Sequence, residues 1–485
     1  MATSSSSGLS SLGVGSNLDV DSIISSLMKV ERAPLTGMQD TATKLNAKLS
    51  SYGKLQSYVS ALGDAAGKLA TSSNWAQTKA TSSVDAALSA TTTDGAVAGA
   101  YSIQVTALAS SQTLASASRS SATEAAGMSG TLRIEGGNWN ADQSAFTPIN
   151  YPSFVDVAIS SSDSMESIRD KINASSAGVS ASIISDSSGS RLILRSKATG
   201  AESGFRLSVT DDDGDSGDAN GLSSLGFDPS AGVNSMQQTK AASDAIAVVD
   251  GLTVTSKTNT FDGVIQGVSF VAKAPTTTAA TLSVAYDTDT MRKNVEAFVT
   301  AYNDLATYMK AQTKYDQDSK TAGTLQGDAG ANALRSALRS LGTANSGGSA
   351  SFDRLSEIGL DPQSDGTLKI DTGKLTAAVA KPEEMKKLFG DNAIGDDTDD
   401  GFGSRIRDWS RSMLSIDGAV VTRQTSLKEQ LRQNSKQQSD FEDRMTAVQA
   451  RLTAQYSALD TQMGKLNALS TYVTQQVANW NKSSS

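Results

Sequence analysis

About sixty residues at the C-terminal end of the chain repeat an apolar residue at steps that alternate between four and three positions. This spacing places the apolar side chains on one narrow stripe of an α-helix, which is the pattern of a coiled-coil seam. The apolar seam positions are Leu427, Leu431, Phe441, Met445, Val448, Leu452 and Leu459. After an extra step of four the seam continues through Met463, Leu466 and Val473. Such a stutter unwinds a coiled coil locally without ending it.

The first seventy residues carry a shorter repeat of the same kind. Its seam includes Leu45, Leu49, Tyr52 and Val59. Ser, Thr, Gln, Lys and Arg surround both stripes, and so narrow an apolar face favours a partner helix. Ordinary packing in a helical bundle is the alternative, because most apolar helix stripes are core faces.

Polar residues and glycines interrupt both repeats. Asn434 and Gln438 occupy seam positions, where polar side chains cost stability but fix the register. Gly53, Gly63 and Gly67 each weaken the N-terminal helix by about 1 kcal/mol relative to Ala. We therefore expect terminal arms that are mobile until a partner docks. The pattern indicates an assembly protein.

Composition narrows the possible functions. The chain has no Cys and no His, which excludes thiol nucleophiles, disulfides, thiolate metal sites and His-based catalytic triads. A catalytic site of Asp, Glu, Lys and Tyr, as in glycosidases, stays possible, but the usual acid–base residue is missing and no nucleotide-binding motif is present. We expect no enzyme and no cofactor. The net charge of −9 without a basic patch argues against nucleic acid as a partner.

The N-terminal sequence and the acidic runs bear on location and ion binding. The Ser-rich start lacks the charged and apolar regions of a Sec signal peptide, and no apolar stretch is long enough to span a membrane. We expect the acidic runs at 211–218 and 396–400 to be solvated loops, since neither has the Glu that closes a calcium loop.

The alternation of helical and β-strand patterns predicts a multidomain α+β chain. It has terminal coiled-coil helices, a helical-bundle domain with a β-hairpin, and two distal β-rich domains, one inserted in the other. The predicted parts are a disordered export region (1–17), an N-terminal coiled-coil arm (18–72), a helical stalk domain (73–84 and 288–415), a β-rich head domain (85–128 and 240–287), an inserted β/α head domain (129–239) and a C-terminal coiled-coil arm (416–485).

Local signals mark several element boundaries. Asp19 is expected to cap a first helix that ends before Pro34. A helix at 163–175 should be capped by Asp163 or Ser164. The pair Asp365-Gly366 suits a type I′ turn in a hairpin.

Three stretches of sequence resemble one known family. They are SNLDVDSIISSLMKVERAPL at 16–35, the pair of segments 163–200 and 250–270, and RLSEIGLDPQSDGTLKIDTGKL at 354–375 with the following KLFG at 387–390. The middle segments also occur in other flagellar axial proteins, whereas the combination resembles the flagellar filament cap proteins, the FliD or hook-associated protein 2 family. The resemblance runs in order along nearly the whole chain.

The resemblance implies a structural protein that is secreted through the flagellar export apparatus, with an export chaperone, to the filament tip. There it would form a ring-shaped homo-oligomer whose terminal helices act as legs. The ring would help flagellin subunits fold and insert, and some members of the family bind host mucin.

Two other interpretations of the sequence remain open. The chain could be another flagellar axial protein, either a hook–filament junction protein or a flagellin, which would polymerise into long filaments. It could also be a secreted adhesin or carbohydrate-active enzyme, with Tyr101, Trp139 and Tyr151 stacking on sugars.

Overall fold

The computed structural model describes residues 19–149, 154–216, 218, 220–318, 320–346, 349–390 and 400–482. The chain forms two compact units, which we treat separately. One combines the N-terminal residues up to Trp75 with the residues from Met291 onward, and the other comprises Ala76–Thr290. The predicted export region 1–17 and most of the acidic run 396–400 lie outside the described residues.

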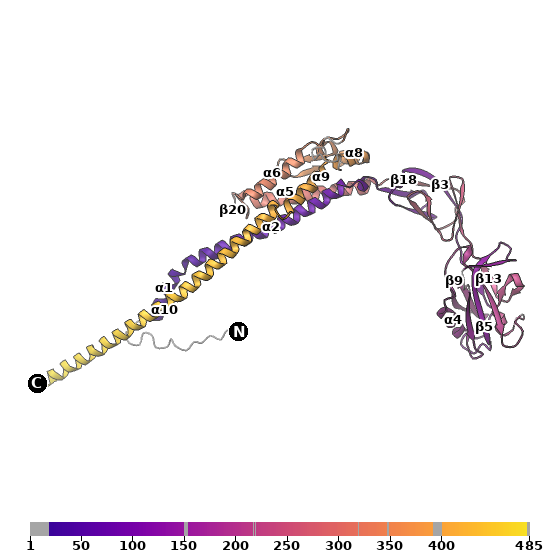
Figure 1. The fold of residues 1–485 in the computed structure, drawn as a ribbon, viewed down its shortest axis with the longest axis horizontal. Coiled ribbons are helices and arrows are strands. Elements are labelled where there is room, and N and C mark those ends of the chain that lie inside the picture. Colours follow the sequence, from indigo (N-terminus) through magenta and orange to yellow (C-terminus); the bar gives the residue numbers. More distant parts are fainter. Residues whose placement is uncertain are drawn as a thin grey trace. The chain divides into compact units, whose positions relative to one another are not determined.

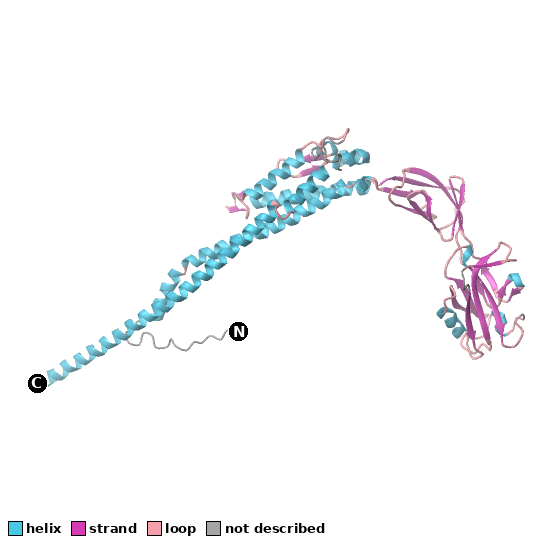
Figure 2. Cartoon of the chain, viewed as in Figure 1, coloured by secondary structure: helices cyan, strands magenta, loops and turns pink. Residues whose placement is uncertain are grey.

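The first unit is mainly helical (Figures 1 and 2). Its described elements are α1 (Val20–Glu31), α2 (Ala33–Ala70), α3 (Ser72–Trp75), α5 (Thr288–Thr313), β19 (Tyr315–Asp316), β20 (Thr321–Ala322), α6 (Ala329–Thr343), the 3₁₀ helix η4 (Leu355–Ile358), β21 (Leu360–Pro362), β22 (Leu368–Ile370), α7 (Thr372–Val379), α8 (Pro382–Phe389), α9 (Phe402–Leu414) and α10 (Ala419–Lys482).

The start of the chain folds as its local signals predicted. The Asp19 side chain accepts a hydrogen bond from the Ser22 amide and caps α1. Helix α1 ends at Glu31, and α2 begins with Pro34 in its first turn, where proline is tolerated because its missing N–H has no helical partner. The prediction of a helix that ends before Pro34 is confirmed.

The core of the helical unit takes in much of the predicted N-terminal arm. Its largest buried side chains include Trp75, whose ring stacks on Phe389 with centroids 5.7 Å apart, and Phe298 of α5. Tyr52 and Val59 of α2 are fully buried in the same cluster. The predicted boundary at 72, which separated an arm from the helical domain, is therefore wrong, because the second half of α2 supplies core residues.

The sequence pattern did not predict helix α9 (Phe402–Leu414), which changes the interpretation of two glycines in α2. A Cβ atom on Gly63 would lie 2.8 Å from Ser410 Cβ, and one on Gly67 would contact the Arg407 side chain at 3.6 Å. These glycines allow α2 and α9 to approach closely rather than simply weakening a mobile arm. Nothing lies within 4 Å of the corresponding position on Gly53.

This contrast predicts opposite effects of the same substitution on two glycines of one helix. Gly53→Ala should raise the free energy of unfolding by up to about 1 kcal/mol, since alanine favours a helix and meets no neighbour. Gly63→Ala should lower it by about 1–3 kcal/mol, because the new methyl group forces α2 and α9 apart. Thermal unfolding followed by circular dichroism at 222 nm would compare the two variants, and equal effects would contradict the close α2–α9 contact.

The β21–β22 hairpin is present, but its turn differs from the prediction. Gly366 has a φ of +92°, whereas Asp365 is absent from the described residues with positive φ. A type I′ turn needs positive φ at both central residues. The Gly366 amide donates to the Gln363 carbonyl at 3.0 Å, and the Gln363 amide donates to Thr367 at 2.8 Å. The connection is therefore a longer loop in which Gly366 alone takes the left-handed conformation.

The second unit consists largely of antiparallel strands (Figure 2). Its first domain contains two sheets. The five-stranded sheet has the order β1 (Thr78–Ser82), β18 (Ala280–Tyr286), β3 (Gly99–Ala107), β14 (Ala245–Val249) and β15 (Leu252–Ser256). The three-stranded sheet has the order β16 (Thr260–Ile265), β17 (Val268–Ala272) and β2 (Leu88–Thr92). The core between them contains the stacked rings of Phe261 and Phe270. Because β1 pairs with β18, residues 78–82 belong to this domain and not to the helical stalk as predicted.

An inserted domain lies between β3 and β14, which are neighbours in the five-stranded sheet. Its elements are β4 (Thr113–Ala115), β5 (Gly130–Trp139), β6 (Phe146–Pro148), β7 (Phe154–Ile159), α4 (Met165–Ala174), β8 (Val179–Asp186), β9 (Gly189–Ser196), η1 (Ala201–Ser203), β10 (Gly204–Asp211), η2 (Gly221–Leu225), β11 (Phe227–Asp228), η3 (Pro229–Ala231), β12 (Val233–Asn234) and β13 (Gln237–Lys240). They form one sheet of β13-β4-β9-β8 and one of β12-β11-β10-β5-β6, with β7 also paired to β5.

The insertion is longer than predicted. Strand β4 pairs with β9 and β13, and Leu114 and Met128 are buried in the core of the inserted domain. The predicted start at 129 is therefore wrong, because residues 113–128 already belong to this domain.

Asp211 also departs from the predicted solvated loop. It is buried, and its carboxylate accepts hydrogen bonds from the amide and hydroxyl of Ser223 at 2.9 and 3.2 Å.

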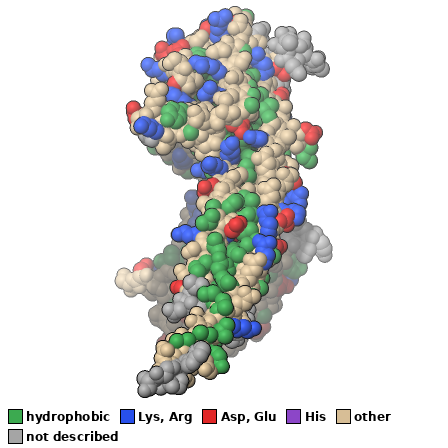
Figure 3. Space-filling view, turned by 90° about the vertical axis from the view of Figure 1, so that its left-hand side faces the viewer, with side chains coloured by type: hydrophobic (Ala, Val, Ile, Leu, Met, Phe, Trp, Pro, Cys, Tyr) green, Lys and Arg blue, Asp and Glu red, His purple; other side chains and the backbone are tan. Residues whose placement is uncertain are grey.

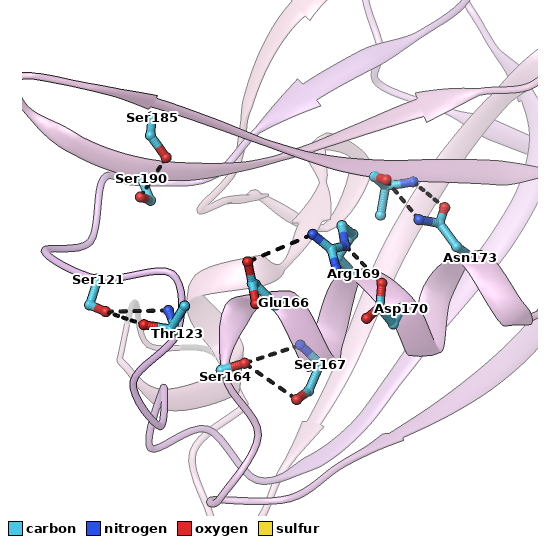
Figure 4. Close-up of polar contacts among 11 residues, drawn as sticks. Ser121, Thr123, Ser164, Glu166, Ser167, Arg169, Asp170, Asn173, Ser185 and Ser190 are labelled. Atoms are coloured by element: carbon cyan, nitrogen blue, oxygen red, sulfur yellow. Dashed lines mark hydrogen bonds and ion pairs between the residues drawn. The ribbon is translucent and has the colours of Figure 1, made fainter.

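Helix α4 protects the free edge of strand β8 (Figure 4). Ser164 caps the helix by accepting a hydrogen bond from the Ser167 amide, which decides between the two predicted caps. Farther along, the Asn173 amide donates to the Ala181 carbonyl and accepts from the Ala181 amide, both at 2.8 Å. These are the two hydrogen bonds that another strand would make with Ala181, so Asn173 blocks the edge at this point.

Replacement of Asn173 by alanine should expose this edge. Two backbone groups of Ala181 would lose their partners, at a cost of about 1–3 kcal/mol. Hydrogen exchange measured by mass spectrometry should show faster exchange in β8. Asp170→Ala on the exposed side of the same helix is the control, with an expected effect within about 0.5 kcal/mol. Unchanged protection of β8 in Asn173→Ala would contradict the edge-blocking role.

Candidate assembly interface

The predicted seam residues divide into three groups in the helical unit. Tyr52, Val59 and Leu427 are buried in the main core, and Leu45 and Leu49 are partly buried against it. Leu431 is half-buried. The first part of α10 therefore pairs with α2 of the same chain, and the seam here contributes to a helical bundle, as in the alternative reading.

The second group forms a separate small core between α1 and α10. Phe441 and Met445 are buried together with Val20, Ile24 and Met28, and Val448 and Leu452 pack against them. The role of α1 as the partner was missed, although its buried residues recur at steps of four, which is a recognisable helical stripe. Gln424 of α10 contacts Gln56 of α2. Farther along α10, Phe441 and Met445 pack against α1, which precedes α2 in the sequence. Helix α10 therefore runs antiparallel to α1 and α2.

The third group is the distal part of the seam, most of which is exposed. Met463 is half-buried, whereas the exposed members of this stripe are Leu459, Leu466, Leu469, Tyr472, Val473 and Val477. Leu466 is 58% exposed and Val473 51%. Figure 3 views the structure from the side of its C-terminus and shows apolar side chains gathered in a band along the near helices. A regular exposed stripe of this kind is typical of a helix that binds another helix.

A buried polar network joins the terminal helices to the helical domain. Asp328 at the start of α6 accepts hydrogen bonds from the Tyr52 hydroxyl at 2.6 Å and from the Arg423 guanidinium at 2.8 Å. The same carboxylate caps α6 through the amides of Gly330 and Ala331. One side chain thus links α2, α6 and α10, and the Asp328 side chain is only 1% exposed.

The hydrogen bonds determine the ionisation of this network. Burial alone would raise the pKa of Asp328, but the hydrogen bonds from Tyr52, Arg423 and the helix amides outweigh it and hold the pKa below its ordinary value. Burial and the hydrogen bond to Asp328 raise the pKa of Tyr52 well above that of a free phenol. Asp328 is therefore an ionised carboxylate that fixes the position of α10 along α2.

Neither a metal-binding cluster nor a membrane span is found among the described residues. They contain no group of three or more His, Cys, Asp and Glu side chains that could hold a metal ion. Within the same part of the chain, no helix combines the length and apolar character needed to cross a bilayer. Trp139, a candidate for sugar stacking, packs on Phe146 with ring centroids 4.7 Å apart, and Tyr151 lies outside the described residues.

The fold combines a mainly helical unit, built from both ends of the chain, with a unit of antiparallel strands. Comparison with known proteins identifies the family. Residues 16–112 match the N-terminal region and residues 242–468 the C-terminal region of flagellar hook-associated protein 2, and residues 131–198 match the flagellin hook IN motif. The chain belongs to the flagellar hook-associated protein 2 family, the flagellar cap proteins.

Individual relatives cover nearly the whole chain. Flagellar hook-associated protein 2 of Escherichia coli strain K12 is 33% identical over 97% of this chain and 98% of its own length. The B-type flagellar hook-associated protein 2 of Pseudomonas aeruginosa is 34% identical over 96% of this chain and 97% of its own. The crystal structure of the D1-D2-D3 domains of the Escherichia coli cap protein FliD matches with a TM-score of 0.58 and 31% identity, covering 78% of this chain and 99% of that one.

These matches decide among the readings that the sequence left open. They confirm the resemblance to the cap family rather than to a junction protein, a flagellin or a carbohydrate-active enzyme. The protein is a structural component of the bacterial flagellum and not an enzyme.

Proposed function

We propose that this protein forms a ring-shaped homo-oligomer at the tip of the flagellar filament, where it promotes the folding and insertion of flagellin subunits. Membership of the cap family supports a position at the tip. The observation that carries the assembly part of the proposal is the exposed stripe of α10, from Leu459 to Val477.

The seam of α10 changes its role along its length. Its first two segments are covered by α2 and α1, which hold the helix in place within one chain. The segment beyond them has the same apolar spacing but no described partner, so its side chains are available to another subunit or to the filament. A narrow apolar stripe buries little area per contact, which suits a leg that must bind and release repeatedly.

We assign the seam residues to two classes. The distal residues are the proposed assembly contacts, and the residues covered within the chain hold the distal residues in position. Met463, Leu466 and Val473 belong to the first class. Phe441, Met445, Val448 and Leu452 belong to the second, since they hold α10 against α1.

Export through the flagellar apparatus with a dedicated chaperone is part of the same proposal. Adhesion to host mucin is a separate one, which binding of the purified protein to immobilised mucin would test.

Deletion of the gene provides the main functional test. Loss of the cap should abolish swimming and release unpolymerised flagellin into the medium, and the intact gene should restore both. Electron microscopy of the purified protein should show small closed rings, because a cap closes its symmetry whereas a flagellin-like subunit polymerises without limit. Filaments of normal length in the deletion strain, or long polymers of the purified protein, would refute the proposal.

A further inference from the structure

A cleft of about 320 Å³ lies in the helical unit, apart from the exposed seam of α10. Helices α5 and α6 form two of its walls, and the tip of the β21–β22 hairpin forms a third through Ser364, Asp365 and Gly366. Met309 and Leu338, which are buried in the core of this unit, also line it. These two apolar side chains are already covered within the chain, so the accessible part of the cleft is its polar rim.

Three cationic side chains and one carboxylate surround this cleft. Lys310 comes from α5, Arg335 and Arg339 from α6, and Asp365 from the hairpin. The side chain of Lys310 is 53% exposed, and its Nζ lies 3.5 Å from Asp365 Oδ2. The lining therefore carries two more positive charges than negative ones, in a chain whose net charge is −9.

The guanidinium groups retain hydrogen-bonding capacity. Arg339 Nη2 donates to the Ser364 carbonyl at 2.8 Å, and Arg335 Nη1 donates to Thr313 Oγ1 at 3.0 Å. Each guanidinium has five N–H donors, so both can bind a further acceptor while keeping these contacts. The contacts anchor the two side chains at the rim, which lowers the entropic cost of binding a ligand.

We propose that this cleft binds an acidic segment of a partner protein. Carboxylates of Asp or Glu would pair with Arg335, Arg339 and Lys310, since the planar guanidinium matches a carboxylate in a bidentate geometry. Three cationic side chains from two helices offer separate partners to several carboxylates, which favours an acidic segment over a single phosphate. This inference does not depend on the assignment as a cap protein.

Asp365 competes with the ligand in this arrangement. Its carboxylate binds Lys310 and also accepts hydrogen bonds from the amide and hydroxyl of Thr367 at 3.1 and 2.6 Å. Asp365→Asn removes the charge but leaves an oxygen that can accept from the Thr367 amide, so the hairpin should be preserved. This variant should bind an acidic peptide more tightly than the natural protein does.

Fluorescence anisotropy with a fluorescein-labelled peptide of ten glutamates would test the site on the full-length protein. We expect binding that weakens steeply as salt rises. The double variant Arg335→Glu/Arg339→Glu should lose affinity by about tenfold or more, and Asp365→Asn should gain about threefold. Arg432→Glu is the matched control, since Arg432 is an exposed cation of α10 and should leave affinity unchanged.

Folding of each variant would be checked by circular dichroism, and Lys310→Glu is the alternative if the double variant unfolds. Equal affinity for all variants would overturn the proposal, as would absence of binding by the natural protein at low salt. Inorganic phosphate that binds through the same residues, while the glutamate peptide does not, would also overturn it in favour of a small-anion site.

Discussion

Asp328→Ala is expected to lower the free energy of unfolding of the helical unit by about 3 kcal/mol. The substitution removes the partner of two buried or half-buried groups, the Tyr52 hydroxyl and the Arg423 guanidinium, and also uncaps α6. The effect should lie at the low end for a broken buried ion pair, because the side chain of Arg423 is 34% exposed and regains water. Urea unfolding followed at 222 nm would measure it.

Asp371→Ala is the matched control for this experiment. Asp371 also caps a helix, α7, by accepting from the Lys374 amide, but it is exposed. Its loss should cost only about 1 kcal/mol. If the two variants were equally stable, the network of Tyr52, Asp328 and Arg423 would contribute nothing beyond a helix cap.

The same network predicts a dependence of stability on pH. The pKa of Asp328 is lower in the folded protein than in the unfolded chain, so its contribution is present above about pH 4 and is lost as pH falls further. Asp328→Asn keeps the shape of the side chain but cannot ionise. The stability difference between the natural protein and this variant should shrink from pH 6 to pH 2, and a constant difference would show that the pKa of Asp328 is the same in the folded and unfolded states.

Leu466→Asp is expected to abolish swimming without destabilising the isolated protein. Leu466 is already largely exposed, so the free energy of unfolding should change by less than about 0.5 kcal/mol. Assembly is different, since a charge placed in an apolar contact between helices must be buried without a partner. Swimming in soft agar, together with flagellin lost to the medium, would measure the loss of function in a complemented deletion strain.

Gln475→Asp provides the comparison that isolates the seam. Gln475 is exposed on the same helix nine residues later, which is about two and a half turns, so it lies on the opposite side from Leu466. Both changes add one negative charge. Only the change in the stripe should affect swimming, and similar behaviour of the two variants would mean that the stripe is not the assembly contact.

Much of the local structure could be predicted from sequence. Asp19, Ser164 and Pro34 mark helix ends because capping and the backbone of proline act over a few residues. The seam of α10 was visible because helical periodicity depends only on spacing. The resemblance to the cap family was also visible, since it rests on short ordered motifs.

Contacts between distant segments were not visible in this way. The repeat of α10 runs from Leu427 to Val477 with one stutter, yet Leu427 is buried in the main core, Phe441 is buried against α1 and Leu466 is exposed. Gly63 could be read only as a weak point until α9 supplied Ser410 as its neighbour. Asp328 and Asp371 both cap helices, and only the fold brings Tyr52 and Arg423 to the first of them.

For this protein, the sequence by itself determined which face of each terminal helix is apolar and where most helices begin and end. The tertiary structure decided how much of each apolar face is covered within the chain and how much is left for a partner. The physical reason is the separation along the sequence over which each effect acts. Caps, turns and helical periodicity involve residues a few positions apart, whereas burial depends on which segments meet after the chain has folded.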